Sequence, residues 1–273
     1  MHRTDLRAPL RPERVRPDPC GGWQVRHVAS AGSTNADLVA AAAAGAPDRT
    51  VLVADLQTAG RGRLGRSWQA PAGAALTVSI LLRPRSVPPS RRGWVGALLG
   101  LAALTAVRRR TGLPAELKWP NDLLIGGRKV AGILAELTGA GALVVGLGLN
   151  VSLEQAELPR PDATSLLLAG AQPESLGREQ LLAAVLDAFG PLLDRWDAAG
   201  GDVDAAGLRA EYLAHCVTVG TAVTIQLPDG ARLTGTATDV APDGSIVIDS
   251  AGGPRSFTAG DVVHLRPGPD GRR

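Results

Sequence analysis

The first two hundred residues alternate between short apolar runs that are typical of strands and longer stretches rich in alanine and leucine that are typical of helices. Strands are predicted at Trp23–Val28, Val51–Leu56, Ala75–Leu82, Glu116–Trp119, Leu123–Ile125, Val130–Glu136 and Leu143–Leu149. Helices are predicted at Ser33–Ala44, Arg91–Arg110, Arg178–Trp196 and Asp204–His215. This pattern indicates an α/β domain over residues 23–215, in which helices pack on a sheet.

The pattern changes on both sides of this domain. After Cys216 come four β-type runs, with turn tripeptides at Pro228–Gly230 and Pro242–Gly244. Such a segment predicts a small SH3-like β-barrel over residues 216–267, followed by a tail at 268–273. Residues 1–22 are rich in arginine and proline and show no periodicity, so we expect a disordered leader.

Charge and composition narrow the function classes. The formal net charge of the 273-residue chain is +3. Residues 1–22 and 266–273 each carry a net charge of about +2, so the rest is near neutral and lacks the basic face that nucleic-acid binding needs. The longest apolar stretch, Trp94–Val107, is too short to cross a bilayer. No signal peptide is visible, and the two cysteines are far apart, so a reducing, cytoplasmic location is expected.

Residues 60–68 hold the densest candidate chemistry, because three arginines alternate with three glycines and Trp68 closes the run. We call Gly60–Trp68 the arginine loop. Its guanidinium groups suit phosphate or carboxylate, and its glycines favour a loop that closes over an anion. The spacing also matches G-x-G-x-x-G, but Pro71 and Gly73 stand where a dinucleotide-binding helix would have to run. No Walker motif is present.

Lysine is rare in this chain, which has 29 basic residues of which only Lys118 and Lys129 are lysines. In a composition so biased toward arginine, a retained lysine suggests a need for a compact ammonium group. Both lysines lie in one segment, Lys118–Glu136, which reads KWPNDLLIGGRKVAGILAE. This segment is the second candidate for site chemistry.

Five motifs together resemble the biotin–protein ligase family. They are Ser33-Thr34-Asn35, the arginine loop, the Lys-Trp-Pro-Asn-Asp-Leu run from Lys118, the Arg-Lys-Val-Ala-Gly-Ile-Leu-Ala-Glu run that ends at Glu136, and Val145–Asn150. The resemblance covers about residues 23 to 266 and implies a catalytic domain with a mixed sheet and a small C-terminal β domain. Residues 1–22 are too short for the helix-turn-helix module of some family members, so a repressor role is not expected.

The resemblance implies an ATP-dependent reaction in two steps. Biotin is activated to biotinoyl-5′-AMP with release of pyrophosphate, and a lysine of a biotin carboxyl carrier domain then takes the acyl group. That domain would belong to an acyl-CoA or pyruvate carboxylase. Such a reaction needs charge neutralisation and positioning and requires no enzyme nucleophile. ATP and biotin are the expected substrates, with Mg²⁺ accompanying the nucleotide.

The resemblance also implies site residues. Lys129 and Arg63 are the expected catalytic residues. The expected biotin contacts are Ser33, Thr34, Asn35, Gln57, Gly60, Arg61, Gly62, Arg63, Lys129 and Gly132. The expected nucleotide contacts are Arg61, Arg63, Arg66, Trp68, Asn121, Lys129 and Asn150, and Asp122 is the candidate magnesium ligand.

Each assignment has an ordinary structural alternative. Ser33–Asn35 fits simple capping of a helix, Lys129 fits a surface position in a hairpin, and Asp122 fits an Asx turn. For the chain as a whole, the alternatives are a lipoate–protein ligase and a protein that binds nucleic acid through its arginine loop. We expect no nucleic-acid or membrane partner, and a monomer or weak homodimer.

Overall fold

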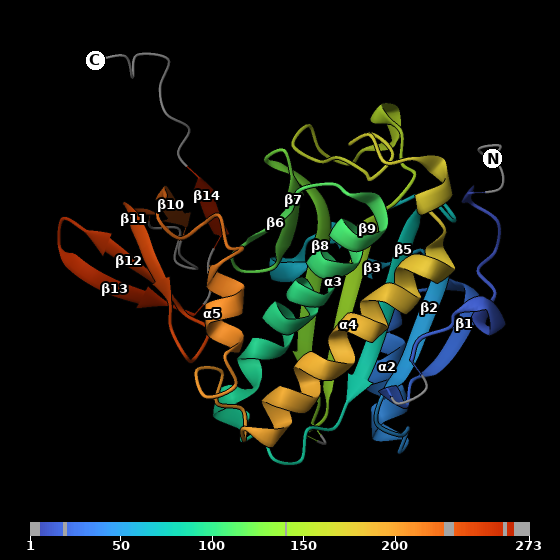
Figure 1. Cartoon of the computed structure of the whole chain (residues 1–273), viewed down its shortest axis with the longest axis horizontal. Coiled ribbons are helices and arrows are strands. Elements are labelled where there is room, and N and C mark those ends of the chain that lie inside the picture. The colour runs from blue at the N-terminus through green and yellow to red at the C-terminus, as the bar shows by residue number, and fades with distance from the viewer. Residues whose placement is uncertain (1–5, 19–20, 140, 227–231, 259–260, 265–273) are drawn as a thin grey trace.

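A seven-stranded mixed sheet forms the centre of the first domain in the computed structural model, which describes residues 6–18, 21–139, 141–226, 232–258 and 261–264 (Figure 1). The strand order is β1-β2-β5-β9-β8-β7-β6; β1 and β2 pair in parallel and all other neighbours are antiparallel. The strands are β1 (Gln24–Ala31), β2 (Thr50–Gln57), β5 (Ala75–Leu82), β6 (Ala115–Lys118), β7 (Asp122–Ile125), β8 (Arg128–Leu137) and β9 (Leu143–Asn150).

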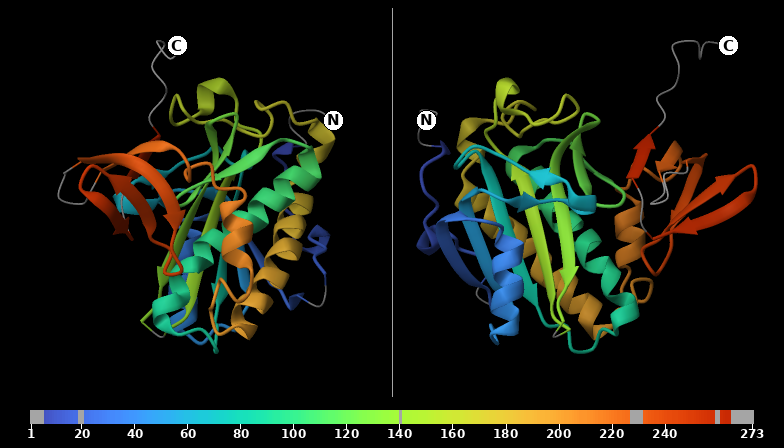
Figure 2. Two further views of the ribbon diagram at one scale, coloured as in Figure 1. Left: turned by 60° about the vertical axis from the view of Figure 1, so that its left-hand side comes forward. Right: turned by 180° about the vertical axis from the view of Figure 1, so that it is seen from behind.

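Helices cover both faces of this sheet. Helices α3 (Val95–Thr111) and α4 (Arg178–Ala198) lie on the face that is toward the viewer in Figure 1. Helix α2 (Thr34–Ala43) lies on the opposite face, which is seen from behind in Figure 2. The main core lies between the sheet and the α3–α4 layer, where Trp94, Phe189 and Trp196 are almost fully buried. The expected mixed sheet with packed helices is confirmed.

Local sequence explains where these helices begin and end. Ser33 caps α2 by accepting a hydrogen bond from the backbone N–H of Ala36, and Gly112 ends α3 in the left-handed conformation. The predicted helix from Arg91 starts later, since residues Pro89–Trp94 form a 3₁₀ turn. The predicted helix from Asp204 shortens to α5 (Leu208–Leu213), which Gly207 precedes at φ 69°. Further 3₁₀ turns are Pro12–Arg14, Arg63–Gly65, Gln155–Glu157 and Pro173–Ser175.

The C-terminal domain is a five-stranded antiparallel sheet with the order β13-β12-β11-β10-β14, which confirms the small SH3-like β domain. Its strands are β10 (Ala222–Gln226), β11 (Arg232–Val240), β12 (Ile246–Ser250), β13 (Gly253–Phe257) and β14 (Asp261–His264). Pro242–Gly244 makes the predicted turn, in which the N–H of Gly244 bonds to the carbonyl of Ala241. The predicted turn at Pro228–Gly230 and the tail at 268–273 lie outside the described residues.

The expected disordered leader is wrong for the described residues before β1. Leu6, Leu10 and Val15 are at most 6% exposed and join the main core. The Arg7 guanidinium pairs with the Glu157 carboxylate at 2.7 Å, and the Arg178 guanidinium donates to the Ala8 carbonyl. We call this segment, residues 6–18, the N-terminal strap. Among its described residues, Pro12–Arg14 form a short 3₁₀ turn and Leu6 is the only other helical residue, which is too little for a helix-turn-helix.

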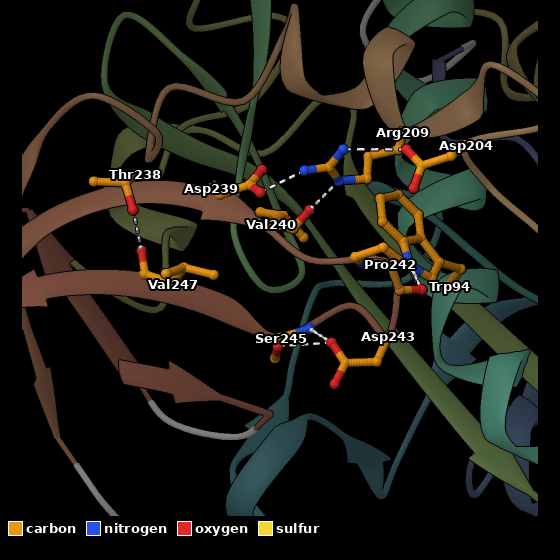
Figure 3. A network of polar contacts seen from close by, with 10 residues as sticks. All are labelled: Trp94, Asp204, Arg209, Thr238, Asp239, Val240, Pro242, Asp243, Ser245 and Val247. Carbon is orange, nitrogen blue, oxygen red and sulfur yellow. Dashed lines mark hydrogen bonds and ion pairs between the residues drawn. The ribbon is translucent and has the colours of Figure 1, made fainter. Parts of the chain in front are cut away.

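Two tryptophans of the first domain hold the C-terminal domain at its Pro242–Gly244 turn, and Figure 3 shows one of them, Trp94. The indole of Trp94 donates to the Pro242 carbonyl at 2.8 Å, and that of Trp119 donates to the Gly244 carbonyl at 3.0 Å. Arg209 adds hydrogen bonds to the Val240 carbonyl and to Asp239. The junction therefore combines apolar contact with satisfied polar groups.

A membrane-spanning helix is absent from the described part of the chain. No helix there combines the length and the apolar character that a bilayer crossing requires.

The burial of the N-terminal strap predicts that Leu10→Ala destabilises the protein. Leu10 is 2% exposed, so the substitution should leave a cavity and lower the free energy of unfolding by about 2–5 kcal/mol. Denaturant unfolding measures this loss, with the exposed Arg14→Ala as the control. Unchanged stability of Leu10→Ala would mean that the strap does not pack in solution.

The domain junction predicts different effects for two buried tryptophans. Trp94→Phe removes the donor to Pro242, whereas Trp196→Phe removes an indole N–H that has no hydrogen-bond partner among the described residues. Both side chains are at most 1% exposed. We expect Trp94→Phe to lose about 1–3 kcal/mol more than Trp196→Phe, because it leaves a carbonyl unpaired. Equal losses in urea unfolding would contradict a hydrogen-bonded junction.

Candidate active site

The arginine loop folds into a two-stranded hairpin on the α2 face of the sheet (Figure 2). Strand β3 (Gly60–Arg61) pairs with β4 (Ser67–Trp68), and the N–H of Gly62 bonds to the Arg66 carbonyl at 2.7 Å. At the tip, Leu64 has φ 54° and is 62% exposed. The loop is thus a short cover over the sheet, with its strained residue exposed to solvent.

Bare glycines let Trp68 lie directly on the sheet. Gly132 of β8 and Gly148 of β9 face each other in the ladder. A Cβ on Gly148 would lie 2.4 Å from Trp68 Cε2, and one on Gly132 would lie 3.4 Å from Trp68 Cζ3. A side chain added at either position would hinder this packing, most severely at Gly148. We call the pair Gly132 and Gly148 the glycine floor.

A polar network lies at the α2 end of this floor. Gln57 Oε1 accepts from the backbone N–H of Thr34 at 2.8 Å and lies 3.0 Å from Thr34 Oγ1. Ser79 Oγ donates to Asn35 Oδ1 at 2.5 Å and contacts Thr34 Oγ1 at 2.7 Å. Because the one hydroxyl hydrogen of Ser79 goes to Asn35, the single hydrogen of the Thr34 hydroxyl is shared between Gln57 Oε1 and Ser79 Oγ. The lone pairs of the Thr34 hydroxyl therefore stay available to a ligand N–H.

The hydrogen bonds of Asn35 differ from those expected of a residue that contacts biotin directly. Its Nδ2 donates to the Leu134 carbonyl at 3.2 Å and to Glu136 Oε2 at 2.7 Å, while its Oδ1 accepts from Ser79. Both amide hydrogens are thus used within the protein, and Asn35 is 5% exposed. This geometry indicates that Asn35 holds neighbouring side chains in place. It gives no evidence for a direct hydrogen bond from the Asn35 amide to biotin.

A cluster of cations surrounds one carboxylate beside Gly132 of the glycine floor. Lys129 Nζ lies 2.5 Å from Asp122 Oδ1, and Lys118 is the ladder partner of Asp122. Burial lowers the pKa of Lys118, and the nearby Asp122 carboxylate partly offsets this effect. Burial likewise lowers the pKa of Arg63, and Asp122 again acts in the opposite direction. Asp122 thus serves as the counter-ion of several cations.

This environment does not fit a resident magnesium ion. Asp122 is already paired with Lys129, and the described residues hold no group of three or more histidines, cysteines and acidic side chains. A cation at Asp122 would face the Lys129 ammonium directly. The expectation that Asp122 is a magnesium ligand therefore gains no support, and any Mg²⁺ would have to arrive with the phosphates of its substrate.

Two asparagines border the floor, and one of them has unused hydrogen-bonding capacity. Asn121 Nδ2 donates to the Ile133 carbonyl, and Asn150 Nδ2 donates to the Thr164 carbonyl, each at 2.9 Å. Asn150 is 2% exposed, and its Oδ1 has no partner among the described residues. The buried Trp68 Nε1 also lacks one there. A ligand that donates to Asn150 and accepts from Trp68 would satisfy both.

Two cavities adjoin the arginine loop. One, of about 400 Å³, lies between the domains, where its lining includes Arg63, Trp119, Asn121, Tyr212 and Asp243. The other, of about 370 Å³, lies beneath the loop and includes Arg61, Arg63, Arg66, Leu134 and Glu136 in its lining. Arg63 borders both, so it links the space under the loop with the space between the domains.

Most of the residues named from sequence come together here. Lys129 and Trp68 meet at Gly132, where a Cβ would lie 3.2 Å from Lys129 Nζ. At Gly60, a Cβ would lie 2.4 Å from the Trp68 carbonyl and 3.0 Å from Gln57 Nε2. Sequence reasoning missed Ser79 and assigned no role to Glu136. A polar residue inside the apolar run Ala75–Leu82 was the available signal for Ser79, and the end of a dense motif was the signal for Glu136.

Comparison with known proteins finds matches to both domains of the chain. The Biotin/lipoate A/B protein ligase family matches residues 33–152, and the biotin protein ligase C-terminal domain matches residues 218–265. The biotin–[acetyl-CoA-carboxylase] ligase of Mycobacterium tuberculosis is 42% identical over 273 residues, which cover 97% of this chain and 99% of that protein. The enzyme of the same name from Paracoccus denitrificans is 31% identical over 84% of this chain and 96% of its own length.

Solved structures show the same fold. The biotin protein ligase from Aquifex aeolicus in complex with biotin and ATP has a TM-score of 0.73 and 27% identity, covering 89% of this chain and 99% of that one. Family models thus match both domains, and a 42% identical relative spans nearly the full length. The chain belongs to the biotin protein ligase family.

Proposed function

We propose that this protein activates biotin with ATP to biotinoyl-5′-AMP and transfers biotin to a lysine of a biotin carboxyl carrier domain. One observation carries the proposal. A group of neutral hydrogen-bonding side chains at Thr34 and Gln57 and a cationic cluster at Lys129 lie along the same glycine floor, covered by Trp68 of the arginine loop. Such a site suits a molecule that is neutral at one end and anionic at the other.

The neutral end fits the ureido ring of biotin. A ureido group has two N–H donors and one carbonyl acceptor, so it needs both kinds of partner. The Thr34 hydroxyl has lone pairs to accept a ligand N–H, and Gln57 keeps its Nε2 as a donor while its Oε1 faces Thr34. Ser33, 6% exposed, begins the same helix. Ser33, Thr34 and Gln57 are therefore the proposed ureido contacts, with Asn35 behind them.

The cationic end fits the reacting carboxylate and phosphate groups. Lys129 is placed to neutralise the biotin carboxylate and the α-phosphate as they approach, while Arg61, Arg63 and Arg66 surround the space beneath the loop. Gly60, Gly62 and Gly132 keep that space free of side chains. Fixed positive charge in a partly buried site stabilises the charge that develops during phosphoryl transfer.

The nucleotide base fits between Trp68 and Asn150. The exocyclic amine of adenine is a donor that the unpartnered Asn150 Oδ1 can accept, and Trp68 offers a flat apolar surface. Asn121 lines the cavity between the domains, into whose wall Arg63 also extends. We assign the nucleotide to this end of the floor and its phosphates to the side of Arg63 and Lys129.

These contacts support a reaction without a covalent enzyme intermediate. An oxygen of the biotin carboxylate attacks the α-phosphorus of ATP, and pyrophosphate leaves. The amine of the acceptor lysine then attacks the acyl carbon, loses a proton and displaces AMP. The residues bind, orient and neutralise charge, and the arginine loop limits access of water to the mixed anhydride.

The polar groups at Thr34 and Gln57 and the placement of the cations also argue against the two alternative functions, lipoate ligation and nucleic-acid binding. Lipoate carries an apolar dithiolane ring, which would leave the lone pairs of the Thr34 hydroxyl and the Nε2 of Gln57 unused, so these polar groups favour biotin. A protein that binds nucleic acid needs a basic surface, whereas the cations of this site lie next to Asp122 and beneath the arginine loop. We further propose an acyl-CoA or pyruvate carboxylase as the source of the acceptor, and a monomer or weak homodimer.

The proposal predicts that Lys129→Ala slows biotin-dependent release of pyrophosphate from ATP by about 10²–10³-fold, because an oriented cation at the reacting centre is lost. The assay supplies biotin and lipoate separately. Arg195→Ala, which removes a cation from an exposed surface pair with Glu211, is the control and should stay within about twofold. Release with lipoate alone, or full activity of Lys129→Ala with biotin, would overturn the assignment.

A further inference from the structure

One carboxylate connects the pocket proposed for biotin with the arginine loop. Glu136 lies near the end of β8, and its two oxygens have different partners. Oε2 accepts from Asn35 Nδ2 at 2.7 Å, while Oε1 lies 3.4 Å from a guanidinium nitrogen of Arg61. Its side chain is 27% exposed and that of Arg61 is 49% exposed, so the pair sits at the rim of the site.

The inner half of this connection is held in place. The Asn35 amide is fixed from three sides, by Ser79 at its oxygen and by the Leu134 carbonyl and Glu136 at its nitrogen. Gly146 lies against it, since a Cβ there would come within 2.3 Å of Asn35 Oδ1. Because Asn35 cannot turn without breaking buried bonds, it fixes the direction of the Glu136 carboxylate.

The outer half is looser and reaches the loop. Arg61 belongs to strand β3, which begins the hairpin that carries Arg63, Arg66 and Trp68. A partly exposed ion pair of this length holds a side chain only weakly, so its effect is to orient Arg61 and not to lock the loop. Glu136 also supplies negative charge beneath a loop that carries three arginines.

We propose that Glu136 is a positioning residue that orients Arg61 and thereby restrains the arginine loop weakly before substrates bind. The inference rests on the proposed function for its substrate, biotin, but its structural part stands on the Asn35–Glu136–Arg61 contacts alone. The path runs from Thr34 through Ser79 and Asn35 to Glu136, so the residues that face the ureido ring and the loop that covers it share one hydrogen-bonded support.

The proposal separates binding from chemistry. Glu136 touches no reacting atom, so loss of its charge should weaken the assembly of the site and leave the chemical step intact. Glu136→Gln keeps an amide oxygen for Asn35 and removes the charge that faces Arg61. We expect KM for biotin to rise about fivefold, in line with a partly exposed ion pair, while kcat at saturating substrate stays within about twofold.

Hydrogen exchange of the ligand-free protein tests the structural part directly. Amides of residues 60–68 should exchange about fivefold faster in Glu136→Gln than in the wild type. Glu211→Gln is the matched control, because it removes a carboxylate from an ion pair of α5 and should leave the loop unchanged. In an Arg61→Gln background, Glu136→Gln should add no further change, because its partner is already absent.

The outcomes distinguish the two proposals. Equal loop exchange in Glu136→Gln and the wild type, or a full additional effect in the Arg61→Gln background, would overturn the role of Glu136 whatever the reaction is. A fall in kcat at unchanged KM would show a part in the chemical step and would also overturn it. If the wild type released no pyrophosphate with biotin while the exchange results held, the proposed function would fail and the positioning role would stand.

Discussion

The close approach of Trp68 to two bare glycines is the contact on which the rest of the site depends. Gly132 and Gly148 are neighbours across β8 and β9, and a Cβ at Gly148 would meet the indole at 2.4 Å. This contact brings the arginine loop down onto the sheet, with Lys129 beside Gly132 and Gln57 beside Gly60. The β8–β9 ladder positions the floor, while α3 on the opposite face packs behind it.

Two carboxylates, Asp122 and Glu136, neutralise different cationic side chains of the site. Asp122 pairs with Lys129 and lowers the cost of keeping Lys118 and Arg63 charged in partly buried positions. Glu136 faces Arg61 at the opposite side of the loop. Cations that are placed and partly desolvated before substrate arrives need little rearrangement when the negative charge of the reaction develops. This arrangement accounts for a site that has many positive groups and no nucleophile–base pair.

The sequence predicts this architecture well where short-range patterns decide it. Alternating apolar runs define every strand of the seven-stranded sheet, and the glycines of the arginine loop and of Val145–Asn150 indicate close backbone approach. The prediction fails where distant contacts decide. The N-terminal strap at residues 6–18 has a polar, proline-rich composition. Its Leu6, Leu10 and Val15 are nevertheless buried in the main core, against residues that are distant in the sequence. Asn35 and Asp122 have residue types that suit a ligand, but their partners, Glu136 and Lys129, are set by the folded structure.

We propose that this one site forms an acyl-adenylate from biotin and passes the acyl group to a protein lysine. Intact-mass measurement of a biotin carboxyl carrier domain after incubation with the protein, ATP and an equal mixture of biotin and lipoate tests it most directly. We predict a single biotinoyl adduct on one lysine, formed only when ATP is present. An unmodified acceptor, or a lipoyl adduct in its place, would contradict it.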